Sequence, residues 1–172
     1  HANYDGAPKI DGTKLLAHSG AVQAGTLSGS FPSASSTTGI ASGNFSYSEV
    51  GYFSLATQGI YDDGFTVLDS VNGDCTADFS NTVVNGKVGC KFGNLAQTAY
   101  FGRFIPDHLE TQVASQGTFA HACSSFSYNG QTITYASNQH PMLTVTAYNA
   151  ASPAAVTKNY TGAYARLQTS QI

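Results

Sequence analysis

The feature of this sequence that most constrains its fold is a two-residue alternation of apolar and polar side chains, interrupted by short turns. Phe45 and Tyr47 alternate with polar residues, a turn follows at Glu49–Gly51, and the alternation resumes with Phe53 and Leu55. A period of two with many aromatic residues is typical of half-buried β-strands, so this stretch predicts two strands. Because the 3.6-residue period of a helix is weak throughout, we expect an all-β fold of short strands. The architecture that we expect is immunoglobulin-like β-sandwich modules, two in number.

The C-terminal half carries the same alternation. Asn129 and Gly130 separate two alternating runs, which favours a β-hairpin because both residues tolerate positive φ angles. Leu143, Val145 and Ala147 recur at every second position and therefore share one face of a predicted strand. The strand-like segments of this half lie within residues 125–136, 142–150 and 156–169.

Composition restricts the classes of protein that remain. Charged residues make up only 10% of the 172 residues, against roughly 25% in soluble domains, and small polar residues dominate as in extracellular β-proteins. The net charge of −3 offers no basic surface, so no nucleic-acid partner is expected. The absence of a run of about 18 apolar residues predicts no membrane span. The chain begins at His1 rather than at Met, which we interpret as a processed form or a fragment.

Three cysteines bear on the cellular compartment. Cys75 and Cys90 bracket a loop with Asn85-Gly86 at its tip, which resembles a hairpin stapled across its base. A disulfide there would contribute about 3 kcal/mol through the entropy of the unfolded chain, and it would suit an oxidising, extracellular compartment. Two buried thiols are the alternative, and no spacing typical of a metal site is present. We expect Cys123 to be a small buried residue, or else to pair with a partner outside this sequence.

The segment "YFGRFIPDHLE", residues 100–110, concentrates chemically active side chains. Arg103, Asp107, His108 and Glu110 could form an acid–base group. However, glycoside hydrolysis needs two carboxylates that flank a bond, and these two lie three positions apart in one segment. No G-x-S-x-G nucleophile elbow is present. We therefore expect no enzymatic activity from this cluster.

A structural role explains the same segment better. Pro106 fixes its own φ angle and restricts Ile105 to an extended conformation. We expect Phe101 and Phe104 to be buried and Arg103 to pair with a carboxylate or with backbone carbonyls. The predicted domains are a β-sandwich module with a stapled hairpin over residues 1–101 and a second β-module, expected to be incomplete, over residues 102–172. The residues assigned to the joint between them are Phe101, Arg103, Phe104, Pro106 and Asp107.

Other candidate sites are weaker. Acidic turns such as those of Asp62, Asp63, Asp69 and Asp74 can bind calcium, but the series of oxygen ligands that an EF-hand loop requires is absent. The histidines lack zinc-site spacing. Tyrosine residues could line a sugar-binding face, although core packing is the better interpretation. We expect no cofactor and no bound metal.

Six motifs in order give the sequence a family resemblance. Together they resemble the C-terminal region of MshQ-like proteins, which are large secreted proteins associated with mannose-sensitive haemagglutinin type IV pili. The resemblance covers residues 36–168, and the family region continues past the position that matches Leu167. The resemblance supplies no catalytic or ligand-binding residue. The motifs lie at residues 45–55, 85–90, 102–108, 122–131, 143–150 and 159–167.

The resemblance implies a non-enzymatic, extracellular structural or adhesive module at the bacterial cell surface. Its expected partners are other β-modules of the same protein or pilus components. Two alternatives remain open, namely a carbohydrate-binding module and a filament subunit that self-assembles by strand exchange. We also expect that a terminal segment, residues 1–30 or 156–172, lies along a sheet edge of another copy or of another module.

Overall fold

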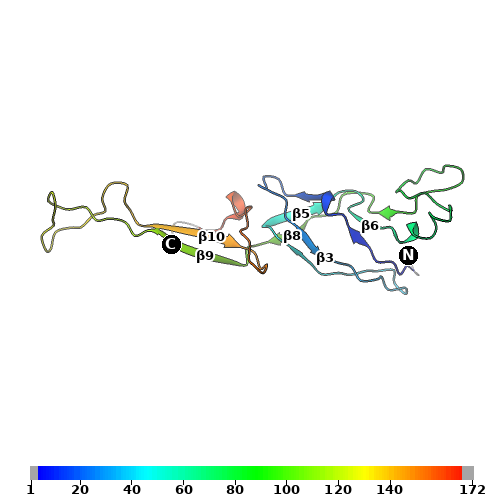
Figure 1. Cartoon of the computed structure of the whole chain (residues 1–172), viewed down its shortest axis with the longest axis horizontal. Helices are drawn as coiled ribbons and strands as arrows, with labels where there is room; N and C mark the ends of the chain where they lie inside the picture. Colours follow the sequence, from blue (N-terminus) through cyan, green and yellow to red (C-terminus); the bar gives the residue numbers. More distant parts are fainter. Residues whose placement is uncertain (1–3, 168–172) are drawn as a thin grey trace. The chain divides into compact units, whose positions relative to one another are not determined.

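The computed structural model describes residues 4–167 and is all-β, as predicted, with no α-helix in that range. Several small antiparallel sheets fit the β-sandwich class (Figure 1). The chain divides into two compact units. The first contains residues 4–105 together with 157–167, and the second contains residues 106–156. The division therefore falls four residues after the expected boundary, and the C-terminal segment belongs to the first unit.

The first unit contains eight short strands in three antiparallel sheets. Two sheets have three strands each, in the orders β1-β6-β7 and β2-β5-β8, and the third is the pair β3-β4. Three 3-10 turns complete the unit. The strands are β1 (Lys9–Ile10), β2 (Leu15–Ala17), β3 (Leu27–Gly29), β4 (Phe45–Tyr47), β5 (Gly51–Leu55), β6 (Ile60–Asp62), β7 (Phe92–Gly93) and β8 (Phe101–Phe104), and the turns are η1 (Gly12–Lys14), η2 (Gly64–Thr66) and η3 (Gly162–Tyr164).

Strands β4 and β5 occupy the positions that the alternating pattern predicts, but they do not pair with each other. β4 pairs with β3, and β5 pairs with β2 and β8, so the chain passes from one sheet to another between them. Tyr47, Phe53 and Leu55 from these two strands form the buried core. The rings of Tyr47 and Phe53 lie 4.7 Å apart, and burial raises the pKa of the Tyr47 hydroxyl. The core of the first unit therefore lies where its sheets meet.

A buried carboxylate lies in the connection between β4 and β5. Glu49 is 3% exposed, and its two oxygens accept hydrogen bonds from Gln23 Nε2 at 2.6 Å and from the backbone N–H groups of Val50, Lys158 and Asn159 at 3.1–3.3 Å. A buried charge is tolerated only when donors surround it, as they do here. Glu49 therefore joins three segments that are distant in the sequence.

Asn159 extends this network and is itself 1% exposed. Its Oδ1 accepts hydrogen bonds from the backbone N–H groups of Val22 and Gln23 at 2.8 and 3.1 Å, and its Nδ2 donates to the carbonyl of Gln23 at 2.8 Å. One asparagine side chain thus satisfies three backbone groups of an irregular loop. The C-terminal segment is held to the first unit by these polar contacts.

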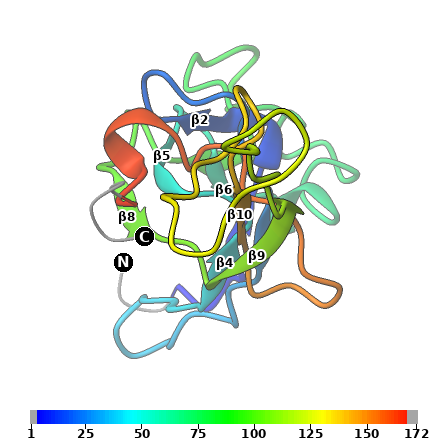
Figure 2. The ribbon, with the colours of Figure 1, turned by 90° about the vertical axis from the view of Figure 1, so that its left-hand side faces the viewer.

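The rest of the C-terminal segment packs through Tyr164, in η3. The Tyr164 ring lies 4.2 Å from the His18 ring and 5.9 Å from the Tyr52 ring, and Figure 2 shows η3, in red, beside β2, β5 and β8. Residues 156–167 therefore form no strand, contrary to the prediction, because single anchor side chains rather than a ladder fix them. Residues 168 and 169 of that prediction lie outside the described residues.

A glycine permits the close approach of β5 to His18. Gly51 has a φ angle of +110°, and a Cβ atom placed on it would lie 2.3 Å from the His18 ring. Only glycine fits this position, because both the backbone conformation and the contact exclude a side chain. His18 is consequently buried between Gly51 and Tyr164.

Both terminal segments are engaged within the chain. β1, β2 and β3 pair with strands of the first unit, Val156 bridges Tyr148, and residues 157–167 belong to the first unit. The described parts of both terminal segments thus contact their own chain, and the expectation that residues 1–30 or 156–172 lie along a sheet edge of another copy or another module stays a prediction. Residues 1–3 and 168–172 lie outside the described residues.

The second unit is built on one long hairpin, β9 (His108–Ser115) and β10 (Met142–Tyr148), which Figure 1 shows side by side.

The predicted hairpin at Asn129 and Gly130 forms a turn without regular strands. Only Gly130 has a positive φ angle there, whereas a type I′ turn needs positive φ at both central residues. Asn85 and Gly86 do meet this condition, with φ angles of 52° and 78°.

We predict that Glu49→Gln destabilises the first unit by about 2–4 kcal/mol, because an amide N–H₂ would face backbone donors and leave some of them unsatisfied. Urea denaturation followed by near-ultraviolet circular dichroism would measure the change. Glu110→Gln is the matched control, because Glu110 is exposed and its substitution should change the free energy of unfolding by about 0.5 kcal/mol or less. Equal effects of the two substitutions would contradict the assigned role of Glu49.

Candidate functional site

The segment 100–110 spans the boundary between the two units. β8 ends at Phe104, Ile105 is the last residue of the first unit before the boundary, and Pro106 begins the second unit. β9 then starts at His108. The residues expected to form a joint therefore lie where the chain passes from one unit to the other.

The two phenylalanines of this segment differ in burial. Phe104 is partly buried and lies 5.1 Å from the Tyr47 ring and 5.7 Å from the Phe53 ring. Phe101 is 41% exposed, although its ring stacks on Phe53 at 5.1 Å. The expectation that both rings are largely buried is wrong for Phe101, which begins an edge strand and whose ring contacts that of Phe53.

Arg103 makes a different contact from the one expected. Its guanidinium group lies over the Tyr164 ring, 5.7 Å from the ring centre. Such a cation–π contact contributes about 0.5–1 kcal/mol at an exposed site. Arg103 thereby adds a second link between β8 and the C-terminal segment, beside the packing of Tyr164 on His18 and Tyr52.

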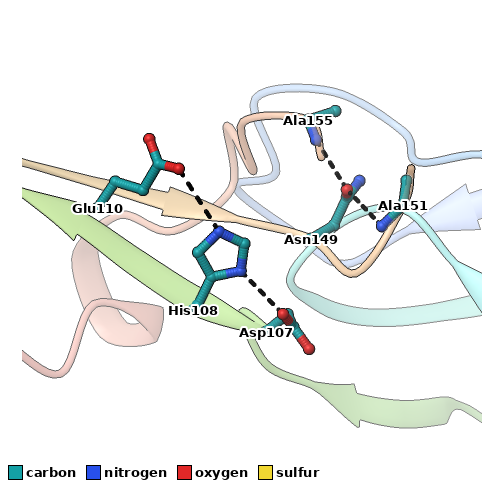
Figure 3. Close-up of polar contacts among 6 residues, drawn as sticks. All are labelled: Asp107, His108, Glu110, Asn149, Ala151 and Ala155. Atoms are coloured by element: carbon teal, nitrogen blue, oxygen red, sulfur yellow. Dashed lines mark hydrogen bonds and ion pairs between the residues drawn. The ribbon is translucent and has the colours of Figure 1, made fainter. Parts of the chain in front are cut away.

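His108 lies between two carboxylates at the start of β9, as Figure 3 shows. Its Nδ1 is 2.8 Å from Asp107 Oδ2, and its Nε2 is 3.9 Å from Glu110 Oε1. The His108 ring also stacks on Tyr148, its partner across the hairpin. All three ionisable side chains are at least 41% exposed, so their ion pairs contribute about 0–1 kcal/mol. The arrangement suits a fixed polar surface better than a pocket that excludes water.

Asn149 shapes the loop that follows β10. Its Oδ1 accepts hydrogen bonds from the backbone N–H groups of Ala151 and Ala155, at 3.1 and 2.9 Å (Figure 3). The backbone N–H of Asn149 donates to the carbonyl of Ala155 at 2.9 Å, and Tyr148 bridges Val156. This loop therefore turns the chain back beside the end of β10.

The hairpin has one apolar face and one polar face. The register pairs Leu143 with Val113, Val145 with Thr111, and Ala147 with Leu109 on one face. On the other face, Thr144, Thr146 and Tyr148 pair with Gln112, Glu110 and His108. Much of the apolar face is open, with Leu109 40%, Leu143 45% and Val113 61% exposed. Sequence reasoning missed β9, although the alternation of Leu109, Thr111 and Val113 was a signal that could have identified it.

Exposed aromatic side chains gather in the connection between β9 and β10. The rings of Phe119 and Tyr135 stack at 5.0 Å, and those of Phe126 and Tyr128 meet edge to face at 5.2 Å. Tyr128 is 64% exposed. The expectation that tyrosine side chains pack in the core therefore holds for Tyr47 but not for the exposed tyrosines between β9 and β10.

The structure pairs Cys75 with Cys90 as a disulfide, with their Cα atoms 5.5 Å apart. Only the tip of the loop is an antiparallel hairpin, with a bridge between Val84 and Lys87, whereas the bridge near the disulfide, between Thr76 and Gly89, is parallel. The stapled element is thus a closed loop with a hairpin tip. Cys123 is free and half-buried.

The carboxylates of the acidic turn at the end of β6 contact other groups of the same chain. Asp62 is buried and accepts hydrogen bonds from the Tyr4 hydroxyl and from the Gly64 N–H, the latter at 2.7 Å. Burial and this hydrogen bond raise the pKa of Tyr4. Lys9 Nζ lies 2.6 Å from Asp63 Oδ1 and lowers the pKa of that carboxyl. Within residues 4–167, no group of three or more His, Cys, Asp or Glu side chains is placed to hold a metal ion.

Residues 88–172 match the family model described as DUF6701, third domain. The match includes β8, β9 and β10, and it fits the expected resemblance to a domain of a large surface protein. No curated protein and no solved structure is significantly similar to the chain. In the part of the chain that the structure describes, no helix is long and apolar enough to cross a membrane.

We predict that Phe104→Ala lowers the free energy of unfolding of the first unit by about 3 kcal/mol, near the lower end for a phenylalanine that contacts a core. Phe101→Ala should cost less than half as much, because its ring is more exposed and contacts Phe53 alone among the core rings. Urea denaturation of both variants measures the difference. A larger loss for Phe101→Ala would contradict the packing described for β8.

Peptide mapping should test the disulfide. Digestion of the native protein without reductant should yield Cys75 and Cys90 in one linked peptide pair, with Cys123 outside it. The expectation follows from the geometry of the pair and from the oxidising compartment that the composition indicates. Free thiols at both positions would contradict the pairing and would weaken the case for an extracellular location.

Proposed function

We propose that this chain is a non-enzymatic structural and adhesive β-module of an extracellular surface protein of the MshQ type, acting beside type IV pili. The observation that carries the proposal is the open apolar face of the β9–β10 hairpin. An amphipathic two-stranded sheet is marginally stable in water until a second layer covers it. Such a unit suits a chain whose role is to be assembled with other β-modules.

Two further features support an extracellular structural role. The disulfide between Cys75 and Cys90 suits an oxidising compartment. The match of residues 88–172 to the third domain of DUF6701 is consistent with a module in a large multidomain protein. The exposed cluster of Asp107, His108 and Glu110 supports the same interpretation, because weak, solvated ion pairs are typical of a surface rather than of an active site.

The proposal predicts surface exposure and a contribution to pilus-dependent adhesion. Antibodies raised against this chain should label intact cells of the source bacterium. Deletion of this segment from the parent gene should reduce mannose-sensitive haemagglutination while the remaining protein is still secreted. Labelling only after cell lysis, together with reduced Cys75 and Cys90, would contradict the proposal.

A carbohydrate-binding module is the second candidate, and the exposed aromatic group of Phe119, Phe126, Tyr128 and Tyr135 favours it. Exposed aromatic rings are suited to stacking against the apolar faces of sugar rings. Binding to a glycan array that Tyr128→Ala abolishes, and that Tyr100→Ala in the first unit leaves unchanged, would favour this candidate. Both tyrosines are exposed, so the second substitution is a matched control.

A further inference from the structure

β9 is the longest strand in the described chain, and one of its edges is free. Among residues 4–167, β9 pairs with β10 alone, so its second edge is open over the eight residues His108–Ser115. The strands of the first unit are two to five residues long. Natural proteins keep edge strands short, or protect them with lysine, proline or bulges, because an open edge is a template for another strand.

β9 carries few of these protective features. It contains no lysine and no proline, and its ionisable residues, His108 and Glu110, lie in its first half. The ladder is irregular between the pairs Met142–Ser115 and Leu143–Val113, where Ala114 of β9 is the extra residue, so the one protective bulge lies near the end of β9. The segment from Thr111 to Val113 therefore offers a regular, uncharged edge to an incoming strand.

The size of the apolar face indicates what kind of partner covers it. Seven registered pairs make the face about 24 Å long and about 10 Å wide, or roughly 240 Å² in projection. A stable dimer buries about 800 Å² on each partner, so two copies that met through this face alone would associate weakly. An added strand gains backbone hydrogen bonds along the edge as well as apolar contacts.

The charge on the hairpin indicates which charge the partner strand should carry. Glu110 projects from the polar face, its side chain is 63% exposed, and the hairpin strands contain no lysine or arginine. Opposite charges in directly facing positions stabilise neighbouring strands. An incoming strand is therefore favoured if it carries a basic residue opposite Glu110.

We propose that the free edge of β9 accepts an extended strand supplied by another β-module, in which apolar side chains face Leu109, Thr111 and Val113 and a lysine or arginine faces Glu110. The inference rests on the proposed function, because it names the partner of the same apolar face. The added strand widens the apolar face and converts the two-stranded hairpin into a three-stranded sheet, the minimum that is stable without other support.

A labelled synthetic peptide can test this with the whole 172-residue protein. The probe is a short peptide in which valine alternates with threonine and one threonine is replaced by lysine. We expect saturable binding by fluorescence anisotropy, together with slowed amide hydrogen exchange over residues 108–115. Val113→Lys should weaken binding at least about tenfold, because it places an unpaired charge on the apolar face.

Gln112→Lys is the matched control, because it adds the same charge on the polar face and should leave binding within about threefold. Glu110→Gln should weaken binding of the lysine peptide but not of the peptide with threonine in its place. Near-ultraviolet circular dichroism checks that the first unit is folded in each variant.

Three outcomes would overturn the proposal. They are the absence of peptide binding, equal binding by Val113→Lys and Gln112→Lys, and a concentration-dependent dimer that Val113→Lys abolishes, which would assign the face to a second copy. None of these outcomes bears on cell-surface labelling or haemagglutination. Failure of the strand-acceptor proposal is therefore distinguishable from failure of the proposed function.

Discussion

The first unit depends on the buried carboxylate of Glu49 and on the ring of donors that surrounds it. The strands of this unit are short, and its fully buried apolar core is small, so hydrophobic packing alone leaves irregular segments without support. Glu49 and Asn159 supply that support by satisfying backbone groups of two such segments, at residues 22–23 and 158–159. The same contacts determine that the C-terminal segment belongs to the first unit. Removal of a single partner would leave donors buried without acceptors, which is why such networks are costly to break.

The contacts that stabilise the second unit differ from those of the first. Its hairpin has a regular register and polar residues along one face, yet its opposite face has little apolar cover and one of its edges is open. Ion pairs at His108 and the loop held by Asn149 order the end of the hairpin, but they add little free energy. The two units thus differ, because the first buries a small core and a polar network whereas the second leaves an apolar face and a strand edge open. That division is the physical basis for proposing a modular, structural role.

The sequence predicted the fold class and several strands because alternation is a local signal. β4, β5 and β10 lie within the predicted segments, and Leu143, Val145 and Ala147 share a face as expected. Strand pairing was less predictable, because β4 and β5 follow each other in the chain but join different sheets. The Asn-Gly pair at residue 129 also failed as a signal, since only one of its two residues takes a positive φ angle.

At the candidate site, too, local sequence signals predict only part of the structure. The expected boundary after residue 101 rested on the local restrictions that Pro106 imposes, and the two units divide after residue 105. The contacts of Arg103 with Tyr164, and of Glu49 with Asn159, link residues 61 and 110 positions apart, and no local pattern encodes them. A glutamate in a turn ordinarily predicts a solvated side chain, so the burial of Glu49 was visible only in the structure.

The central claim is that the first unit is stable by itself, whereas the β9–β10 hairpin needs an added layer. Amide hydrogen exchange of the 172-residue protein, resolved along the chain, tests this most directly. The account predicts slow exchange for the amides of β5 and for those that donate to Glu49, and much faster exchange for β9 and β10. Protection of β9 and β10 equal to that of β5, in the isolated protein at a concentration where it is monomeric, would contradict the account.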